Sequence, residues 1–457
     1  MKMFKRFAAA LTCSALIMGF APNVFAAEKT TPAVHLNGAY MESADTLKDY
    51  DCTYMEANQL FTSLGATEIT INEGIVSAVK NDNAVSFSAG NTLYTLNGTE
   101  ISLKTAPFEE NGKLYIPIRP AAEAMECKIG WDNAAQAVII LDPYKLLGDT
   151  ESGYTIMEKY MAYSTEFANE YPYLKGKMTF TVTADDGEEK LTFKGKCDTV
   201  SFTTTEEMII NADFSFSFDE IEDMLVETYK TDPEFENTIN TLESFTLDVY
   251  MDIKDGKFYI SSDLFSLLLG ADENTWILVD FNEIFGMAGM AGMASYDFAS
   301  LSTMAGMESF DEYADSLFSY MSALDNVYMA EATALSLNII KLMYSDESFI
   351  KNGMNYTSTY SLNESGAETV ITLTLMDNGN RIYGYDMEMS MNMDGLIYMY
   401  MDMETVDEDS VFTMNMNMMD MMEVNMDGTF KYEERITDPL VKPDENSFTV
   451  SLTEILF

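Results

Sequence analysis

Residues 382–403 read Ile-Tyr-Gly-Tyr-Asp-Met-Glu-Met-Ser-Met-Asn-Met-Asp-Gly-Leu-Ile-Tyr-Met-Tyr-Met-Asp-Met, and their pattern constrains the architecture more tightly than any other stretch. From Tyr383 to Met393 an apolar side chain occupies every second position, and small, polar or acidic residues occupy the positions between. Side chains alternate between the two faces of a strand, so the pattern predicts a β-strand with one methionine-rich face. Asp394-Gly395 is a hairpin signal, and the alternation resumes after it, which predicts an antiparallel partner strand.

The same alternation recurs after this hairpin at Met414, Met416 and Met418, and it also occurs earlier in the chain. Residues 177–183 and 191–193 flank Asp186-Gly187, residues 245–253 and 257–260 flank Asp255-Gly256, and a further strand is centred on 276–281. We therefore predict a mainly antiparallel β-meander domain over residues 154–457. Its helices are expected at Tyr154–Tyr171, which Pro172 ends, and in two insertions that cover the apolar face, Asp219–Lys230 and Ser309–Tyr344. Gly286–Met293 is a low-complexity loop.

A smaller unit precedes this domain. The stretch Leu114–Arg119 suits a strand, Ala121–Met125 a thin helix, and residues 129–132 and 137–141 two more strands. Tyr54, Leu64, Gly65 and Ala66 fall 61 positions before Tyr115, Met125, Glu126 and Cys127, which indicates two related halves. The fold class predicted for the chain is α+β: a small two-repeat α/β unit followed by a large antiparallel sheet with covering helices.

The small unit resembles a known family. Val34–Gly38, Leu96-Asn97-Gly98, Tyr115–Arg119 and Trp131-Asp132 are similar to the copper amine oxidase N-terminal-like, or stalk, domain. The resemblance implies that residues 32–142 form such a domain, which is common on bacterial surface proteins and need not bring oxidase activity. Residues 143–153, with Pro143 and two glycines, are predicted as a linker. Arg119 is interpreted as a structural pairing residue.

The large domain has its own resemblance. A helix followed by a long meander, with Asp-Gly-Lys-Phe-Tyr at 255–259, is similar in plan to the lipoprotein-carrier half-barrels of bacterial envelopes. That resemblance implies a concave apolar face for an acyl chain, and methionine side chains adapt well to irregular ligands. The candidate ligand-binding residues are Met387, Met389, Met391, Met393, Met399 and Met401. The alternatives are an ordinary packed core and a Cu(I) site built from thioethers.

The N-terminus predicts export. Lys2, Lys5 and Arg6 precede an apolar run at 7–20, and Val24-Phe25-Ala26 suits a cleavage site, so residues 1–26 read as a Sec-type signal peptide. Lipid attachment at Cys13 is the less favoured outcome, because Thr12 is large for that position. We expect the protein outside the cytoplasm or on the cell surface, without a transmembrane anchor.

Net charge disfavours some classes of partner, and the cysteines raise the question of a disulfide. A net charge of -49 repels polyanions, so nucleic acid and anionic membranes are disfavoured. Hydrophobic residues make up 47% of the chain, which indicates a folded protein. Cys52 and Cys127 are candidates for a disulfide in an oxidising compartment, with reduced, buried cysteines as the alternative.

Catalysis is disfavoured because the chain has a single histidine, His35, and no nucleotide-binding glycine signature. We predict no enzyme activity, no metal site and no cofactor. The favoured interpretation is an exported structural or interaction module with an unidentified envelope or extracellular partner. The alternatives are an envelope carrier for a lipid or other apolar ligand, and an extracytoplasmic Cu(I) binder.

Overall fold

The computed structural model describes residues 31–49, 52–185, 190–217, 241, 243–253, 255–270, 272, 274–280, 307, 309–320, 326–364, 366–419, 421–437, 439–444 and 447–452. The predicted signal peptide, the helix at 219–230, the loop at 286–293 and the turn at 186–187 lie outside these residues. The chain divides into two compact units. Met41–Ala121 and Asp132–Val138 belong to the first, and His35–Tyr40, Ala122–Trp131 and the chain from Ile139 belong to the second. Below, the small unit means residues 32–142 and the large unit means the chain from residue 154.

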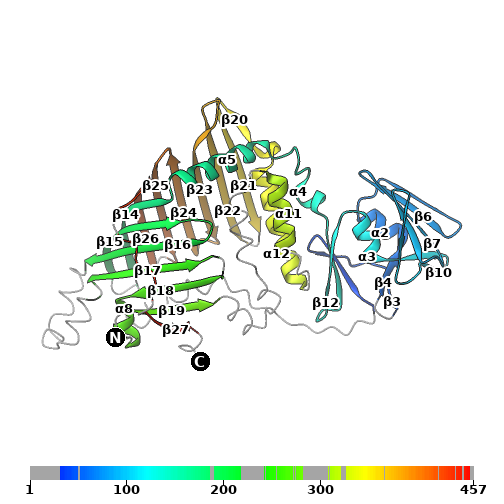
Figure 1. Cartoon of the computed structure of the whole chain (residues 1–457), viewed down its shortest axis with the longest axis horizontal. Helices are drawn as coiled ribbons and strands as arrows, with labels where there is room; N and C mark the ends of the chain where they lie inside the picture. Colours follow the sequence, from blue (N-terminus) through cyan, green and yellow to red (C-terminus); the bar gives the residue numbers. More distant parts are fainter. Residues whose placement is uncertain are drawn as a thin grey trace. The chain divides into compact units, whose positions relative to one another are not determined.

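Three small sheets form between Ala33 and Leu141 (Figure 1). The first has the order β12 (Lys128–Asp132), β13 (Ala137–Leu141), β1 (Ala33–Leu36), β2 (Ala39–Tyr40). The second is β10 (Phe108–Glu110), β11 (Lys113–Pro117), β4 (Cys52–Glu56), β3 (Thr46–Asp49). The third runs β5 (Glu68–Asn72), β6 (Ile75–Lys80), β7 (Asn83–Ser88), β8 (Leu93–Leu96), β9 (Thr99–Ser102).

The predicted internal repeat has a structural counterpart. Strand β4 leads into helix α2 (Ala57–Ser63) as strand β11 leads into helix α3 (Ile118–Ala124). The two strands pair antiparallel, with Ile116 opposite Met55, and both of these side chains are fully buried. The predicted strand–helix–strand order at 114–132 is confirmed. Residues 114–117 of β11 are buried on both faces of the strand, and Ala121 and Ala122 of α3 are fully buried.

The stretch predicted as a linker holds a helix. Asp142 caps helix α4 (Pro143–Leu147) by accepting a hydrogen bond from the Lys145 backbone N–H. Proline suits the first helical turn, where its missing N–H costs nothing, and Gly148 closes the helix with a positive φ of 83°. The same proline and glycine that indicated a linker therefore start and end a short helix.

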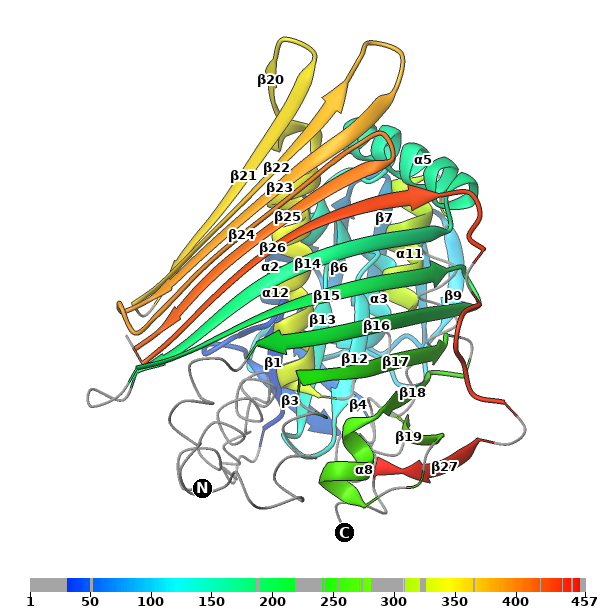
Figure 2. The ribbon, with the colours of Figure 1, turned by 90° about the vertical axis from the view of Figure 1, so that its left-hand side faces the viewer.

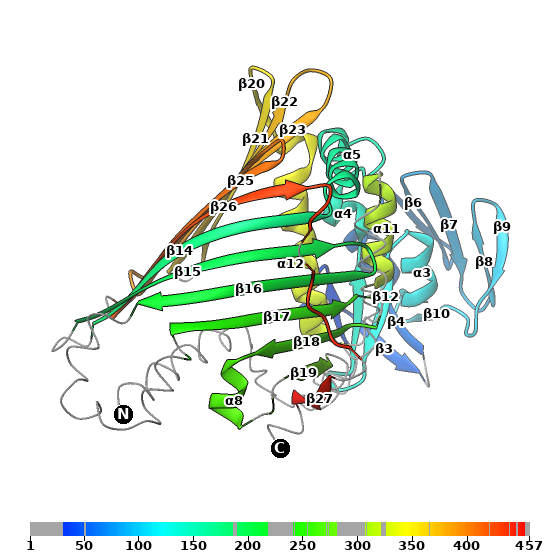
Figure 3. The same cartoon turned by 60° about the vertical axis from the view of Figure 1, so that its left-hand side comes forward.

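One fourteen-stranded sheet forms the large unit. Its order is β20 (Ile350–Asn352), β21 (Asn355–Glu364), β22 (Ala367–Asp377), β23 (Ile382–Met393), β24 (Ile397–Val406), β25 (Asp409–Met418), β26 (Met422–Glu433), β14 (Tyr173–Asp185), β15 (Lys190–Thr203), β16 (Glu207–Ser217), β17 (Ser244–Asp252), β18 (Lys257–Ser262), β19 (Thr275–Asp280) and β27 (Phe448–Ser451). All neighbours pair antiparallel except β19 and β27, which pair parallel. The sheet is strongly twisted from β21 to β18, as Figure 3 shows. The predicted large, mainly antiparallel sheet is thus confirmed.

Two meanders meet in this sheet. Strands β20–β26 and β14–β19 each follow the chain, and β26 joins them by pairing with β14 over twelve registered positions from Tyr173↔Glu433 to Ala184↔Met422. Residues more than 230 positions apart therefore lie side by side in the centre of the sheet. Figure 2 shows β26 between β25 and β14.

The described part of the large unit contains the helices α5 (Thr155–Glu170), α8 (Leu264–Leu269), α11 (Phe310–Tyr320), α12 (Val327–Tyr344) and the 3₁₀ turn η1 (Asp346–Ser348). Helix α5 packs on β23 and α12 on β21. The predicted helices at 154–171 and 309–344 are confirmed, the second as the pair α11 and α12. Within the described residues, no helix is both long and apolar enough to cross a membrane.

Candidate functional site

The register of β23–β26 brings the methionines of four strands onto one side of the sheet. We call this surface the methionine face. It comprises Met387, Met389, Met391, Met393, Ile397, Met399, Met401, Met403, Met414, Met416, Met418, Met422 and Met426. One row across the strands runs Met389, Met401, Met414, Met426, each directly opposite the next. Directly paired side chains of neighbouring strands lie about 5 Å apart, so the face is a continuous thioether surface.

The side chains of the methionine face are incompletely buried. Met387 is 37% exposed and Met393 is 40% exposed, and the other members are half-buried. On the same side of the sheet, but nearer the helices, Leu375 is 0%, Thr405 1% and Ser410 2% exposed. This side of the sheet therefore has a covered zone under the helices, which includes Leu375, Thr405 and Ser410. Its open zone consists of the more exposed methionine face.

Helix α5 closes the covered zone with an aromatic layer. The Tyr160 and Tyr385 rings meet edge to face with centroids 5.7 Å apart, and Phe167 meets Tyr432 at 4.8 Å. Burial raises the pKa of Tyr432 to about 12, and burial together with the charge of Tyr385 raises that of Tyr163 to about 12. Both hydroxyls stay neutral at physiological pH, so these two side chains add no charge to this end of the face.

The apolar surface continues beyond the methionines onto β14–β16. Phe180 lies opposite Met426 on one side and Gly195 on the other. A Cβ on Gly195 would come within 2.2 Å of the Phe180 ring, so glycine lets the ring lie flat on the sheet. The partly buried cluster there includes Met178, Val182, Phe214 and Phe216 around Phe180, Cys197 and Ala212.

The six methionines predicted from the sequence all lie on this face, with Met391 opposite Met399 and Met389 opposite Met401. Whether they bind a ligand stays a prediction. The list of candidate residues left out Met414 and Met416, although the alternation of residues 414–418 indicates that they share the face. It also left out Met426, which lies opposite Met414. The contribution of Phe180 depends on the pairing of β26 with β14, which no local pattern indicates.

The reverse side of the same strands is acidic. Asp386 lies opposite Glu404, and Glu388 lies opposite Asp402. Burial, reinforced by the negative charge of Asp402, raises the pKa of Asp386 to about 6. Like charges directly opposite each other in a sheet are destabilising, so this surface costs stability at neutral pH. Within the described residues, no group of three or more histidine, cysteine or carboxylate side chains is arranged to hold a metal ion.

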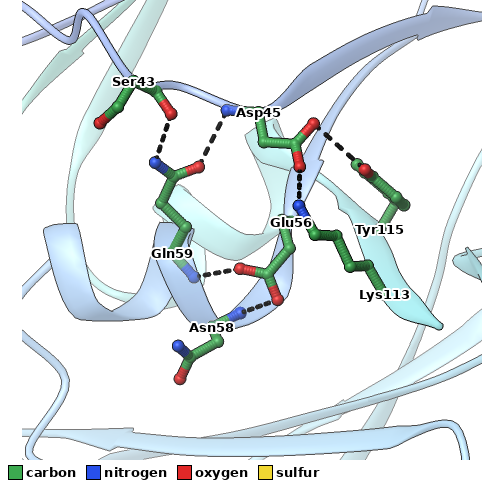
Figure 4. Close-up of polar contacts among 7 residues, drawn as sticks. All are labelled: Ser43, Asp45, Glu56, Asn58, Gln59, Lys113 and Tyr115. Atoms are coloured by element: carbon green, nitrogen blue, oxygen red, sulfur yellow. Dashed lines mark hydrogen bonds and ion pairs between the residues drawn. The ribbon is translucent and has the colours of Figure 1, made fainter. Parts of the chain in front are cut away.

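A hollow lies in the small unit, and Figure 4 shows polar contacts of residues that line it. It has a volume of about 630 Å³ and is lined by Ser43, Asp45, Glu56, Asn58, Gln59, Thr62, Ser63 and Lys113. Asp45 accepts hydrogen bonds from the Lys113 ammonium and, at 3.1 Å, from the Tyr115 hydroxyl. The Lys113 contact holds the pKa of Asp45 below its ordinary value.

The carboxylates of this hollow have structural tasks. Glu56 accepts from the backbone N–H groups of Asn58 and Gln59, at 3.1 and 2.7 Å, and thereby caps α2. The Gln59 amide in turn donates to the Ser43 carbonyl and accepts from the Asp45 N–H, as Figure 4 shows. Both carboxylates are thus engaged in holding loop and helix together, which disfavours an acid–base pair here.

Another hollow, of about 690 Å³, lies on the reverse side of the large sheet beneath Pro439–Val441. The Asn211 side chain pins this segment, because its Nδ2 donates to the Val441 carbonyl at 3.1 Å and its Oδ1 accepts from the Val441 N–H at 2.9 Å. Asn211 also donates to Asp248 at 2.8 Å. These contacts fasten the C-terminal segment to the sheet.

The structure contains no disulfide between Cys52 and Cys127, the pair considered from the sequence. Each thiol donates a hydrogen bond to a nearby backbone carbonyl, Cys52 Sγ to that of Thr53 and Cys127 Sγ to that of Met125. Burial of Cys127 fits the alternative of a reduced cysteine in a core. His35 lies on β1 with its ring 5.5 Å from that of Tyr40, and Arg119 is exposed on α3.

Comparison with known proteins identifies the small unit. Residues 35–140 match the family described as Copper amine oxidase N-terminal domain, which confirms the resemblance noted in the sequence. No curated protein matches the chain.

Two solved structures are similar at low identity. A DUF1329 family protein from Desulfovibrio piger is 9% identical, with 63% of this chain and 96% of that chain covered and a TM-score of 0.21. The outer membrane protein Omp33 of Acinetobacter baumannii is 6% identical, with 58% and 100% covered and a TM-score of 0.12. At these scores neither likeness bears on fold or function.

Proposed function

We propose that this chain is an exported, non-catalytic envelope protein whose large domain carries an apolar, chain-like ligand, such as the acyl chain of a lipid, on the methionine face. The proposal rests on a difference in side-chain exposure along one side of the large sheet. Leu375, Thr405 and Ser410 in the covered zone are at most 2% exposed, whereas Met387 and Met393 remain 37% and 40% exposed. A continuous apolar surface of this extent, open beside a packed zone, suits a ligand rather than a core.

Dimensions and chemistry favour a long ligand. Met387 and Met393 are six residues apart on β23, which spans about 20 Å at ~3.4 Å per residue. Methionine has three side-chain torsions and a polarisable sulfur, so neighbouring thioethers can follow an irregular hydrocarbon chain. Strand positions usually favour β-branched residues, which pack rigidly, and a ligand surface gains from the methionines that replace them here.

Native mass spectrometry of the protein purified without detergent tests the proposal. We expect a co-purifying mass in the range of a fatty acid or phospholipid, released by organic extraction. After extraction, the protein should bind a fluorescent fatty acid that the extracted species displaces. Repeated recovery of the bare protein, together with no uptake of the fluorescent fatty acid, would contradict the proposal.

Paired variants separate an apolar ligand from a copper ion. Met391→Gln with Met399→Gln makes the centre of the face polar and should weaken fatty-acid binding by roughly tenfold or more. Met391→Leu with Met399→Leu keeps the surface apolar but removes two thioethers, so it should bind the fatty acid like the wild type. If the leucine pair instead loses binding of Cu(I) in competition with a weak chelator, the Cu(I) alternative gains support.

The match of residues 35–140 to the Copper amine oxidase N-terminal domain supports a second candidate, a structural module of the cell surface. In that case the large domain would serve as a spacer or as a surface for a protein partner. Fractionation of the producing cells discriminates between the candidates. A carrier should be recovered in the soluble extracytoplasmic fraction with its ligand, and a structural module should stay with the cell wall without one.

A further inference from the structure

Backbone hydrogen bonds link described residues of neighbouring hairpins at the end of the large sheet away from α5. Asp394 N–H donates to the Gly366 carbonyl at 2.8 Å, Met419 N–H to the Leu396 carbonyl at 2.5 Å, and Asp185 N–H to the Met421 carbonyl at 2.8 Å. Figure 2 shows the ends of β24, β26 and β14 close together on this side of the sheet. We call the described residues 393–398, 418, 419, 421 and 422, with Gly366 and Asp185, the tip ridge. The bonds tie these residues into one edge.

The tip ridge exposes large apolar side chains. They are Met393 at 40%, Leu396 at 53%, Tyr398 at 48%, Met419 at 55% and Met421 at 56% exposure. Single exposed apolar residues are ordinary, but a group of five at one edge marks an interaction site. Met393 belongs to both the ridge and the methionine face, so the exposed apolar edge continues directly into that face.

The chemistry of the ridge fits a lipid surface. A segment that enters the apolar region must have its backbone groups satisfied, and the bonds between the tips satisfy several of them. Leucine and methionine partition into lipid, and tyrosine is favoured at the boundary with water. The exposed carboxylates of Asp394 and Glu423 stand at the same edge and repel anionic headgroups.

We propose that the tip ridge docks on the surface of a neutral or zwitterionic lipid bilayer. This inference goes beyond the proposed function, because it concerns a different surface and holds whether or not the methionine face binds a lipid. Docking would place Met393, where the methionine face begins, at the membrane surface. Together with ligand binding on that face, docking gives an apolar ligand a route between the membrane and the protein.

Flotation with protein-free phosphatidylcholine vesicles tests the docking. The wild type should float with the vesicles, with little dependence on salt, and should float less when one third of the lipid is anionic. Met419→Asn with Met421→Ser should lower the bound fraction by roughly tenfold or more. Asparagine is chosen at 419 because Met419 has a positive φ of 54°, which asparagine tolerates.

The matched control is Ile350→Ser with Met354→Ser on the β20–β21 hairpin, whose residues are 75% and 54% exposed. It removes equal or greater exposed apolar surface elsewhere and should leave flotation unchanged. Intact mass establishes that all variants share one N-terminus, so that the apolar residues 7–20 contribute equally. Melting temperatures establish that the variants are folded.

A fluorescence reporter gives the depth of insertion. Neither native tryptophan belongs to the ridge, since Trp131 is on β12 and Trp276 on β19, so Met421→Trp adds a local probe. Vesicles should shift its emission to the blue, and brominated lipids should quench it. The proposal is overturned if the wild type fails to float, if the ridge variant floats equally well, or if binding occurs only to native envelope vesicles and is lost after protease treatment, which would indicate a protein receptor.

Discussion

At the residue scale, the two sides of β23 show how one strand serves two environments. Its methionines face an open apolar surface, whereas Asp386 and Glu388 face acidic partners on β24. Both faces follow from the period-two alternation, so the sequence predicts them. The raised pKa of Asp386 does not follow from alternation, because it depends on burial and on Asp402 across the strand pair.

Asp386 makes stability depend on pH. Its pKa is about 6 in the folded protein against 3.8 ordinarily, so the folded state binds the proton more tightly than the unfolded state. The stability gained from protonation is therefore full below about pH 4 and is lost as the pH rises through 6. Asp386→Asn should raise the melting temperature at pH 8, by the equivalent of about 1 kcal/mol after allowance for solvent screening, and by nearly nothing at pH 4.

Glu368→Gln serves as the control for Asp386→Asn. Glu368 lies on the same side of the sheet, is exposed and faces Asn392 rather than a carboxylate. It should change the melting temperature little at either pH. Equal stabilisation by Asp386→Asn at pH 4 and pH 8 would show that charge burial is not the cause.

At the element scale, helix α5 holds the covered zone of the methionine face closed. Periodicity and Pro172 predict this helix, but its first turn depends on a distant residue. The Asp346 carboxylate accepts hydrogen bonds from the backbone N–H groups of Thr155 and Ile156, at 3.1 and 2.9 Å, and from the Thr155 hydroxyl at 2.7 Å. Tyr154, at the N-cap position, provides no side-chain bond there.

Removal of this cap should loosen α5. Asp346→Ala leaves the first N–H groups of the helix without their acceptor and should lower the free energy of unfolding by about 1–2 kcal/mol, measured by urea unfolding. Glu347→Ala changes the neighbouring, exposed acid and should be close to neutral. If the two variants lose equal stability, the cap contributes nothing specific.

At the scale of the whole molecule, local patterns predict the strands but not the order in which they meet. Hairpin signals such as Asp394-Gly395 and Asp255-Gly256 indicate which neighbours pair within each meander. The junction of β26 with β14 and the parallel pairing of β27 with β19 depend on contacts between distant segments. For the same reason the sequence indicates a methionine-rich face but not its division into covered and open zones.

The central claim, that the methionine face holds an apolar ligand, is tested most directly by NMR of protein labelled with ¹³C at the methionine methyl groups. A spin-labelled fatty acid is added, and its paramagnetic broadening is read at assigned signals. We predict broadening at Met389, Met391, Met399 and Met401, with Met354 on the β20–β21 hairpin and buried Met157 on α5 unaffected. Unchanged signals at those four methionines under saturating label, or equal broadening of Met354, would contradict the claim.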